Sequence, residues 1–373
     1  MQVVRLDTSR RGQVHRFVGL PFDLYRECPA WCPPLRRDVA HAMDRQRHPF
    51  YRHSDADFFL AEDGGRAVGR IAVIENRRFN AARGRRGAFF YFFESGDDPE
   101  VAGALVGAAA DWARARGLDT LIGPKGFLPG DGLGILVEGF EHPVAMGVPY
   151  HHPYYDGLLA GCGLEKETDY LSGIVTQEQN TLPPEFLEAA DAAAAQSGYR
   201  LYPFTTKREL RHWFRRIGEV YNRTFAETWE YCPLTLEEID EIGARLLTLA
   251  DPRLMVLVMR GDDIAGHLFI LPDLADGLRA AKGRLLPFGW ARLLAEGRRT
   301  LTVDLLGLGL LPEHRGMGAN AVVYAAIFRA VGQFRFRRAE VVQIEEGNSR
   351  VLSNMMAVGV PWRHRHRIYR LPL

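Results

Sequence analysis

The same order of predicted elements occurs twice along the chain, and this repeat restricts the folds that the sequence can adopt. In the first half, apolar runs at 57–62 and 67–74 flank the turn Asp63-Gly64-Gly65, a pattern that predicts a β-hairpin. A further strand is predicted at 88–93, followed by a helix that ends near Gly117. The next strand is expected at 118–122, so the order of this half is β-β-β-α-β.

The second half repeats this order. Strands at 254–259 and 264–271 flank the turn Gly261-Asp262-Asp263, and a third strand is expected at 301–310. A helix at 320–334 and a strand at 339–344 complete the unit. We therefore expect two similar units in tandem. The expected fold class is α/β, in which the sheet is mixed, as in α+β folds.

Polar residues and prolines separate the two units. The stretch that begins at Gln177 ends in Pro183-Pro184, a composition typical of a linker. The expected organisation is an N-terminal domain at 1–176, a linker at 177–200 and a C-terminal domain at 201–373.

An additional segment at 275–300 lies between the second and third strands of the C-terminal domain. A segment of this length is usually a lid or a binding segment. We expect it to bend near Pro287 and to place Phe288 and Trp290 against the acceptor substrate. The alternative is a helical hairpin that covers the other domain.

Composition excludes several classes of protein. The 373 residues contain 47 Lys and Arg against 46 Asp and Glu, so a whole-surface nucleic-acid binder is not expected. Four cysteines cannot form a disulfide scaffold. Cys28 and Cys32 have C-x-x-x-C spacing without a second pair, and the close His pairs have no matching Cys or carboxylate, so no metal is expected. Without a long apolar run or a signal-peptide pattern, we expect a cytoplasmic, soluble protein with no membrane partner.

The sharpest local pattern is LLPEHRGMGAN, between the predicted strand at 301–310 and the following helix. Glycines there let backbone N–H groups turn toward a ligand, and the helix start and an arginine add positive charge. This arrangement favours a pyrophosphate, although a tight turn without a ligand has the same pattern. The candidate cofactor-binding residues are Leu310, Leu311, Arg315, Gly316, Met317, Gly318, Ala319 and Asn320.

This turn, placed after the third strand of a β-β-β-α-β unit, resembles the coenzyme A loop of the GNAT superfamily of N-acetyltransferases. That loop has the pattern Arg/Gln-x-x-Gly-x-Gly/Ala, which Arg315 and Gly318 match and Asn320 does not. Asn348 is similar to the family's asparagine that contacts the pantetheine arm. Many members have a proton-donating tyrosine seven residues later, where this chain has Met355.

Nearly the whole chain resembles a group of bacterial tandem GNAT proteins, which implies two tandem GNAT-like folds. The similar segments are 25–26, 31–38, 69–72, 92–94, 149–155, 286–290 and 312–316. The N-terminal unit is degenerate, because its equivalent turn has no arginine and contains Asp97, Asp98 and Glu100, which would repel a pyrophosphate. Coenzyme A is therefore expected in the C-terminal unit.

Acyl transfer requires a polarised thioester carbonyl and a neutral amine. Gly307 and Gly309 predict a bulge with a free N–H near 308–310 that could act as an oxyanion donor, unless these glycines only relieve crowding. The candidate general bases are Glu345 and Glu346, with Asp304 in reserve, and Tyr324 or water would act as the acid because Met355 cannot donate a proton.

The sequence therefore predicts an N-acyltransferase that uses acetyl-CoA or another acyl-CoA as co-substrate. The expected acceptor is a small amine or an amino-acid-like molecule. Two alternatives remain: a Fem-type transferase that takes aminoacyl groups from tRNA, and a non-catalytic protein that binds acyl-CoA or another anion. Nothing in the sequence indicates an oligomeric state.

Overall fold

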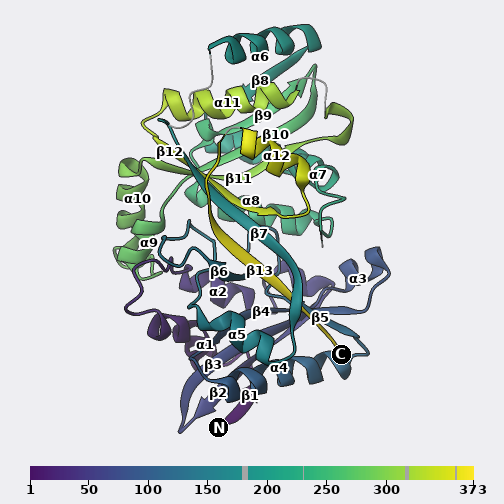
Figure 1. Cartoon of the computed structure of the whole chain (residues 1–373), viewed down its shortest axis with the longest axis vertical. Helices are drawn as coiled ribbons and strands as arrows, with labels where there is room; N and C mark the ends of the chain where they lie inside the picture. The colour runs from purple at the N-terminus through teal and green to yellow at the C-terminus, as the bar shows by residue number, and fades with distance from the viewer. Residues whose placement is uncertain (179–183, 230, 316–318, 358) are drawn as a thin grey trace.

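The computed structural model describes residues 1–373 except 179–183, 230, 316–318 and 358. Within these ranges, a single mixed sheet of 13 strands runs through the length of the molecule, and helices lie along it (Figure 1). The expected mixed α/β class is confirmed.

The first half contains six strands and five α-helices among the described residues. The strands are β1 Gln2–Arg5, β2 Asp55–Asp63, β3 Arg66–Glu75, β4 Gly87–Ser95, β5 Thr120–Gly123 and β6 Ile135–Glu138. The helices are α1 Arg11–Leu24, α2 Arg36–Ala42, α3 Arg77–Arg83, α4 Pro99–Arg114 and α5 Tyr154–Gly161, with a short 3₁₀ turn η1 at Pro49–Arg52.

The second half repeats the hairpin, strand, helix and strand of the first. Strand β7 Glu165–Thr176 follows α5 and leads into the second half, whose strands are β8 Tyr199–Pro203, β9 Met255–Arg260, β10 Asp263–Pro272, β11 Thr302–Leu310, β12 Arg338–Glu345 and β13 Trp362–Pro372. Its helices are α6 Pro184–Ser197, α7 Lys207–Thr224, α8 Leu236–Leu249, α9 Ala275–Ala281, α10 Gly289–Arg299, α11 Ala319–Gln333 and α12 Ser349–Ala357, with 3₁₀ turns η2 Pro252–Leu254 and η3 Pro312–His314. The stretch expected as a linker holds α6 and the start of β8.

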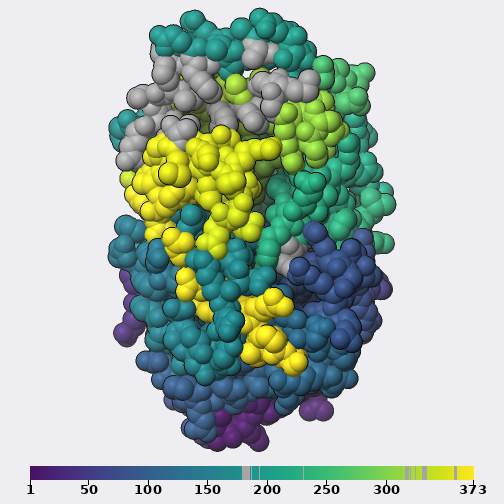
Figure 2. All heavy atoms as spheres, turned by 45° about the vertical axis from the view of Figure 1, so that its right-hand side comes forward, coloured from purple at the N-terminus to yellow at the C-terminus, as the bar shows by residue number. Residues whose placement is uncertain are grey.

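Strands β7 and β13 join the two halves into one sheet. The strand order is β1-β2-β3-β4-β5-β13-β7-β12-β11-β10-β9-β8, and β6 also pairs with β13. The C-terminal strand β13 is therefore a neighbour of β5 in the first half, while β7 pairs with β12 in the second. Figure 2 shows the yellow C-terminal residues among the blue residues of the first half. The rigid connection fixes the two halves relative to each other, since breaking it would unpair buried backbone groups.

The acidic turn of the first half begins helix α4. The Asp98 side chain accepts hydrogen bonds from the backbone N–H groups of Glu100 and Val101, so it is the N-cap. The buried face of α4, which includes Leu105 and Trp112, packs in the core of the first half. These acids thus stabilise a helix start at the position where the second half has its glycine-rich turn.

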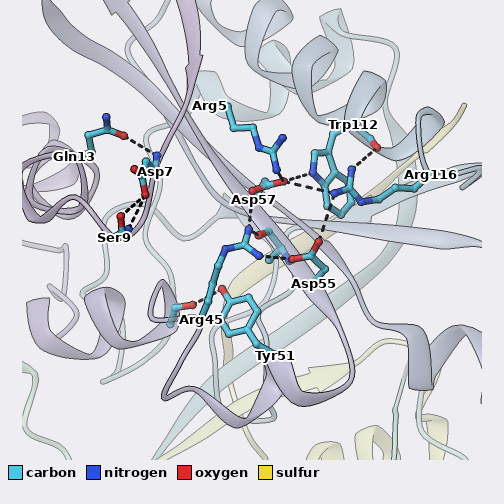
Figure 3. Close-up of polar contacts among 12 residues, drawn as sticks. Arg5, Asp7, Ser9, Gln13, Arg45, Tyr51, Asp55, Asp57, Trp112 and Arg116 are labelled. Atoms are coloured by element: carbon cyan, nitrogen blue, oxygen red, sulfur yellow. Dashed lines mark hydrogen bonds and ion pairs between the residues drawn. The ribbon is translucent and has the colours of Figure 1, made fainter.

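A buried carboxylate connects β1, β2 and the end of α4 (Figure 3). Asp57 on β2 accepts a hydrogen bond of 2.5 Å from the Trp112 indole N–H. Arg5 and Arg45 each approach Asp57 to 2.7 Å, and Arg116 approaches it to 3.7 Å. A buried charge is tolerated only when it is paired in this way.

The additional segment of the second half forms the helical hairpin α9–α10 (Figure 1, left side). One face of the hairpin, with Leu278 and Leu293, packs in a cluster that also holds Tyr25 and Val148 of the first half. The Arg279 guanidinium donates to the carbonyl oxygens of Trp31 and Val144 at 3.1 and 3.3 Å. The hairpin therefore lies against the first half.

Candidate active site

A cavity of about 720 Å³ lies between the two halves of the molecule. One wall consists of the ends of β11 and β12, and the opposite walls come from the segments 31–42 and 124–134 and from the connection between α7 and α8. Its lining is rich in aromatic and aliphatic side chains, among them Trp31, Tyr91, Phe92, Tyr221, Phe225, Trp229, Leu308 and Ile344. A pocket with this volume and lining is of the kind that takes a largely apolar ligand.

Strands β11 and β12 separate where they reach the cavity. Their parallel pairing runs from Thr302 and Arg338 to Leu305 and Val341, after which β11 continues beside β10 and β12 beside β7. Residues on both sides of this separation line the cavity. Two diverging strands leave backbone N–H and C=O groups without a ladder partner, and such groups can bind the amides of an extended ligand.

Each of these strands has an irregularity at the point of separation. In β11, Leu306 is an extra residue between the pairs Leu305–Ile270 and Gly307–Phe269. In β12, the register against β7 shifts between Val341 and Ile344. The expected bulge is therefore present, but at Leu306, whereas Leu308 to Leu310 remain in register with β10. The bulge residue is the one whose backbone lacks a regular partner.

The first half has a buried polar network at the end of β4, where β4 also departs from β5. Glu94 accepts hydrogen bonds of 2.7 Å from both Tyr25 and Tyr155, and Arg70 lies 3.6 Å from the same carboxylate. Arg70 also donates to the carbonyl oxygen of Phe17 at 2.8 Å. These polar side chains satisfy one another through hydrogen bonds and an ion pair. The end of β4 is therefore polar and already paired, whereas the end of β11 is apolar.

Glu345, a candidate general base, lies at the end of β12 and lines the cavity. Partial burial raises the pKa of its carboxyl, and the neighbouring Glu346 carboxylate raises it further. The Thr168 hydroxyl, 3.5 Å away, acts in the opposite direction. A carboxylate with a raised pKa that faces an apolar cavity is suited to accept a proton from an amine.

Glu346, the other candidate at this strand end, points away from the cavity lining. Its carboxylate lies 2.8 Å from the Lys166 ammonium and accepts a 3.0 Å hydrogen bond from the Asp169 backbone N–H. The two neighbouring acids are therefore in different environments, because Glu345 is the last residue of β12 and Glu346 lies in the turn that follows, where it pairs with Lys166.

Asp304, the reserve candidate, is buried outside the cavity lining. Neither of its carboxylate oxygens has a hydrogen-bond partner among the described residues. Burial raises its pKa well above the ordinary value, and repulsion from Asp273 and Glu340 adds to this. Burial likewise raises the pKa of Glu340 to about 8. Burial and the neighbouring acids therefore favour the neutral form of Asp304.

As pH rises, ionisation of Asp304 should lower the free energy of unfolding of the wild type. We expect this fall to be smaller in the Asp304→Asn variant. A folded-state pKa above the unfolded value favours folding at low pH, and this stability is lost as pH rises through the raised pKa, at up to about 1.4 kcal/mol per pH unit. Asn cannot ionise, so the Tm difference between variant and wild type should increase from pH 5 to pH 8. The exposed Asp276→Asn is the matched control, and equal pH slopes in all three proteins would contradict the prediction.

The expected cofactor loop is only partly described. Gly316, Met317 and Gly318, and the side chains of Asn320 and Tyr324, lie outside the described residues. Arg315 donates to the carbonyl oxygens of Leu310 and Thr224 at 3.2 and 2.9 Å, which connects the end of β11 to the end of α7.

Other expected site residues lie around the same strand ends. Leu310, Leu311 and Ala319 are buried and are not among the residues that line the cavity. Asn348 lines the cavity, and its side-chain oxygen accepts a 3.3 Å hydrogen bond from the Val351 N–H at the start of α12. Met355, which replaces the family's tyrosine, also lines the cavity.

Phe288 and Trp290, the expected acceptor-binding residues, are exposed and are not among the cavity-lining residues. Leu278 of the same hairpin does line the cavity. The hairpin thus contributes to the cavity through α9, and its tip faces solvent.

Part of the cavity wall could not be recognised in the sequence. His53 of the first half lies 3.0 Å from Glu238 of α8, and Arg78 lies 3.5 Å from the same carboxylate. Glu238 and His53 both line the cavity. The available signal was the capping box of α8, in which Glu238 binds the Thr235 N–H, but that pattern indicates a helix start and not a site.

Among the described residues, no helix is long and apolar enough to cross a membrane. The same residues contain no group of three or more His, Cys, Asp or Glu side chains that could hold a metal ion.

Comparison with known proteins shows two curated relatives along most of the chain. A bacterial ceramide synthase from Caulobacter vibrioides (strain NA1000 / CB15N) is 31% identical over 305 residues, which cover 80% of this chain and 78% of that protein. Protein YghO from Escherichia coli (strain K12) is 23% identical over 372 residues, 96% of this chain and 93% of that protein. No protein-family model matches the chain.

Solved structures show the same fold. A tandem GNAT protein from the clavulanic acid biosynthesis pathway, without acetyl-CoA, superposes with a TM-score of 0.60 at 14% identity, covering 100% of this chain and 98% of that one. The two tandem GNAT-like folds expected from the sequence are confirmed. The chain belongs to the family of the bacterial ceramide synthase, N-acyltransferases with a tandem GNAT fold.

Proposed function

We propose that this protein transfers the acyl group of an acyl-CoA to the amine of a long-chain, sphingoid-like acceptor. The observation that carries the proposal is the cavity of about 720 Å³ with its apolar and aromatic lining, which reaches from the diverging strands to the first half. A small polar amine would leave most of this surface without contacts, whereas a hydrocarbon chain would bury it. The 31% identity to a ceramide synthase supports the same acceptor class.

The acyl-CoA is assigned to the second half. Strands β11 and β12 stop pairing with each other after Leu305 and Val341, where the amides of pantetheine can pair with the backbone, and the turn with Arg315 precedes a helix start that favours a pyrophosphate. The buried Arg70–Glu94 network and the Asp98 cap give the first half a different chemistry at both equivalent places. In this scheme the first half provides the cavity wall that binds the acceptor.

The proposed reaction forms a bond between the amine nitrogen and the acyl carbon and breaks the bond between that carbon and the coenzyme A sulfur. Glu345 takes a proton from the amine nitrogen, and the free backbone at Leu306 stabilises the negative charge on the carbonyl oxygen. The departing thiolate takes a proton from water or from Tyr324, and Glu345 then releases the amine proton through solvent, which restores that proton donor. Atoms and charge balance with free coenzyme A and an amide as products.

The test measures coenzyme A release with a series of primary amines of increasing chain length. We expect kcat/KM to rise about fourfold per added methylene until the chain fills the cavity, since each buried methylene contributes about 0.8 kcal/mol. Ile242→Trp, which adds bulk to the α8 wall of the cavity, should lower the length at which the rise stops, while Ile242→Val should not.

Three outcomes would count against parts of this proposal. Release that is fastest with short amines would contradict the long-chain acceptor. A requirement for aminoacyl-tRNA would favour the Fem-type alternative. Binding of acyl-CoA without release for any amine would favour a non-catalytic binding protein.

A further inference from the structure

The tip of the α9–α10 hairpin exposes a group of large apolar side chains. The exposed fractions are 78% for Leu286, 73% for Phe288, 55% for Trp290 and 50% for Leu294. These four residues lie within nine positions of one another, and Trp290 and Leu294 are four residues apart on α10, so they share a face of that helix. We call Leu286, Phe288, Trp290 and Leu294 the apolar tip.

The apolar tip projects from a well-packed base. The opposite side of the hairpin is buried against the first half through Leu278 and Leu293. The Gly283 carbonyl oxygen accepts a 2.9 Å hydrogen bond from the Arg36 N–H. A Cβ at Gly289 would lie 1.7 Å from the Arg284 carbonyl oxygen, so the turn closes too tightly for any other residue. The exposure of the tip is therefore a property of a fixed structure, which lowers the cost of ordering it upon binding.

Basic residues surround the apolar tip. From 282 to 299 the hairpin contains Lys282, Arg284, Arg292, Arg298 and Arg299, all exposed, and a single acid, Glu296. Glu296 is buried and lies 2.7 Å from Arg299. The surface around the tip is thus cationic, although the whole chain has a net charge of only +1.

We propose that the apolar tip docks the protein onto the surface of an anionic lipid bilayer. Tryptophan, phenylalanine and leucine side chains that project from a cationic helical hairpin match the boundary between lipid headgroups and acyl chains. Arginines beside them extend aliphatic stems along the apolar layer and keep their charged groups at the anionic headgroups. This surface contact involves no membrane-spanning segment, and it departs from the sequence-based expectation of no membrane partner.

The docking position suits a lipid substrate. Pro34 and Leu35, next to the Arg36–Gly283 hydrogen bond, line the cavity, as does Leu278 of α9. A docked tip would hold this wall of the cavity close to the bilayer, in which a long-chain amine is dissolved. This last step rests on the proposed function, but the docking itself does not.

Co-sedimentation with vesicles tests the docking. The full chain should bind vesicles that contain phosphatidylglycerol, and the combined variant Leu286→Ala, Phe288→Ala, Trp290→Ala should bind at least about tenfold more weakly. Replacing Arg284 and Arg292 by Ala should weaken binding by about fivefold per arginine at low salt, and vesicles of phosphatidylcholine alone should bind the wild type weakly. Leu236→Ala is the matched control, because Leu236 is also 50% exposed but lies on α8.

Equal vesicle binding by the wild type and the combined variant would overturn the proposal, provided that both have the same Tm. The proposal would also be overturned if the wild type did not bind anionic vesicles but formed dimers, and the combined variant did not form them. In that case the partner of the apolar tip would be a second copy of the chain. Vesicle binding is measured without acyl-CoA or amine, so its failure leaves the proposed function standing. Absence of coenzyme A release from a protein that still binds vesicles would count only against the proposed function.

Discussion

Replacing Glu345 by Gln is expected to lower the rate of acyl transfer by about 10²–10⁴ while acyl-CoA affinity stays nearly unchanged. The carboxylate lines the cavity at the end of β12, and burial raises its pKa. Gln has nearly the same shape but cannot accept the amine proton. The measurement compares single-turnover rates with acyl-CoA affinity from calorimetry.

The pH dependence gives a second readout for Glu345. A base must be ionised, so kcat/KM of the wild type should rise through the raised pKa of this carboxyl, above the ordinary value of 4.5. This acid limb should be absent from the Gln variant. Glu346→Gln is the matched control: it should keep most of the activity and shift the acid limb to lower pH, because repulsion from Glu346 contributes to the raised pKa. Full activity of Glu345→Gln across pH 6 to 9 would exclude this residue as the base.

Replacing Asp57 by Ala is expected to destabilise the folded protein by about 3 kcal/mol, the low end for breaking a buried ion pair. The side chain is buried and accepts hydrogen bonds from Trp112 and Arg45, and Arg5 lies 2.7 Å away. Its loss leaves the indole N–H without a partner and brings positive charges together (Figure 3). We expect the lower value of the range for a buried ion pair because Arg5 and Arg45 remain partly exposed to water.

Urea unfolding followed by tryptophan fluorescence measures this effect. Asp111→Ala is the control, since Asp111 pairs with Arg114 on the exposed side of α4 and should change the free energy of unfolding by less than about 0.5 kcal/mol. Equal stability of the two variants would mean that the Asp57 network contributes no more than a surface pair.

Local pattern was sufficient to predict the elements of each half. The hairpin around Gly261, the helix that begins at Ala319 and the strand that ends at Glu345 were expected within a few residues of their observed bounds. Apolar periodicity and turn residues act over short distances, so one sequence contains these signals. The repeat of the same order in both halves then indicated the tandem fold.

Glu345 was a candidate because it ends a strand, and Asn348 because it resembles the family's asparagine; both line the cavity, and their roles stay predictions. The sequence did not indicate the parts of the cavity whose partners are far apart in the chain. The contact between His53 and Glu238, and the wall supplied by 124–134, depend on how the halves are joined. The different environments of Glu345 and Glu346 likewise depend on Lys166 of β7, which is distant in the chain.

What the sequence by itself determined is the order of strands and helices, the tandem repeat and the difference in charge between the two strand-to-helix turns, because each of these depends on neighbouring residues. What only the tertiary structure decided is the pairing of β13 with β5 and of β7 with β12, which joins the halves into one sheet and encloses the cavity between them. It also decided that the hairpin of 275–300 buries Leu278 and leaves Phe288 and Trp290 exposed. All of these side chains are apolar, and whether an apolar side chain is buried depends on the surface opposite it, which strands far away in the sequence provide.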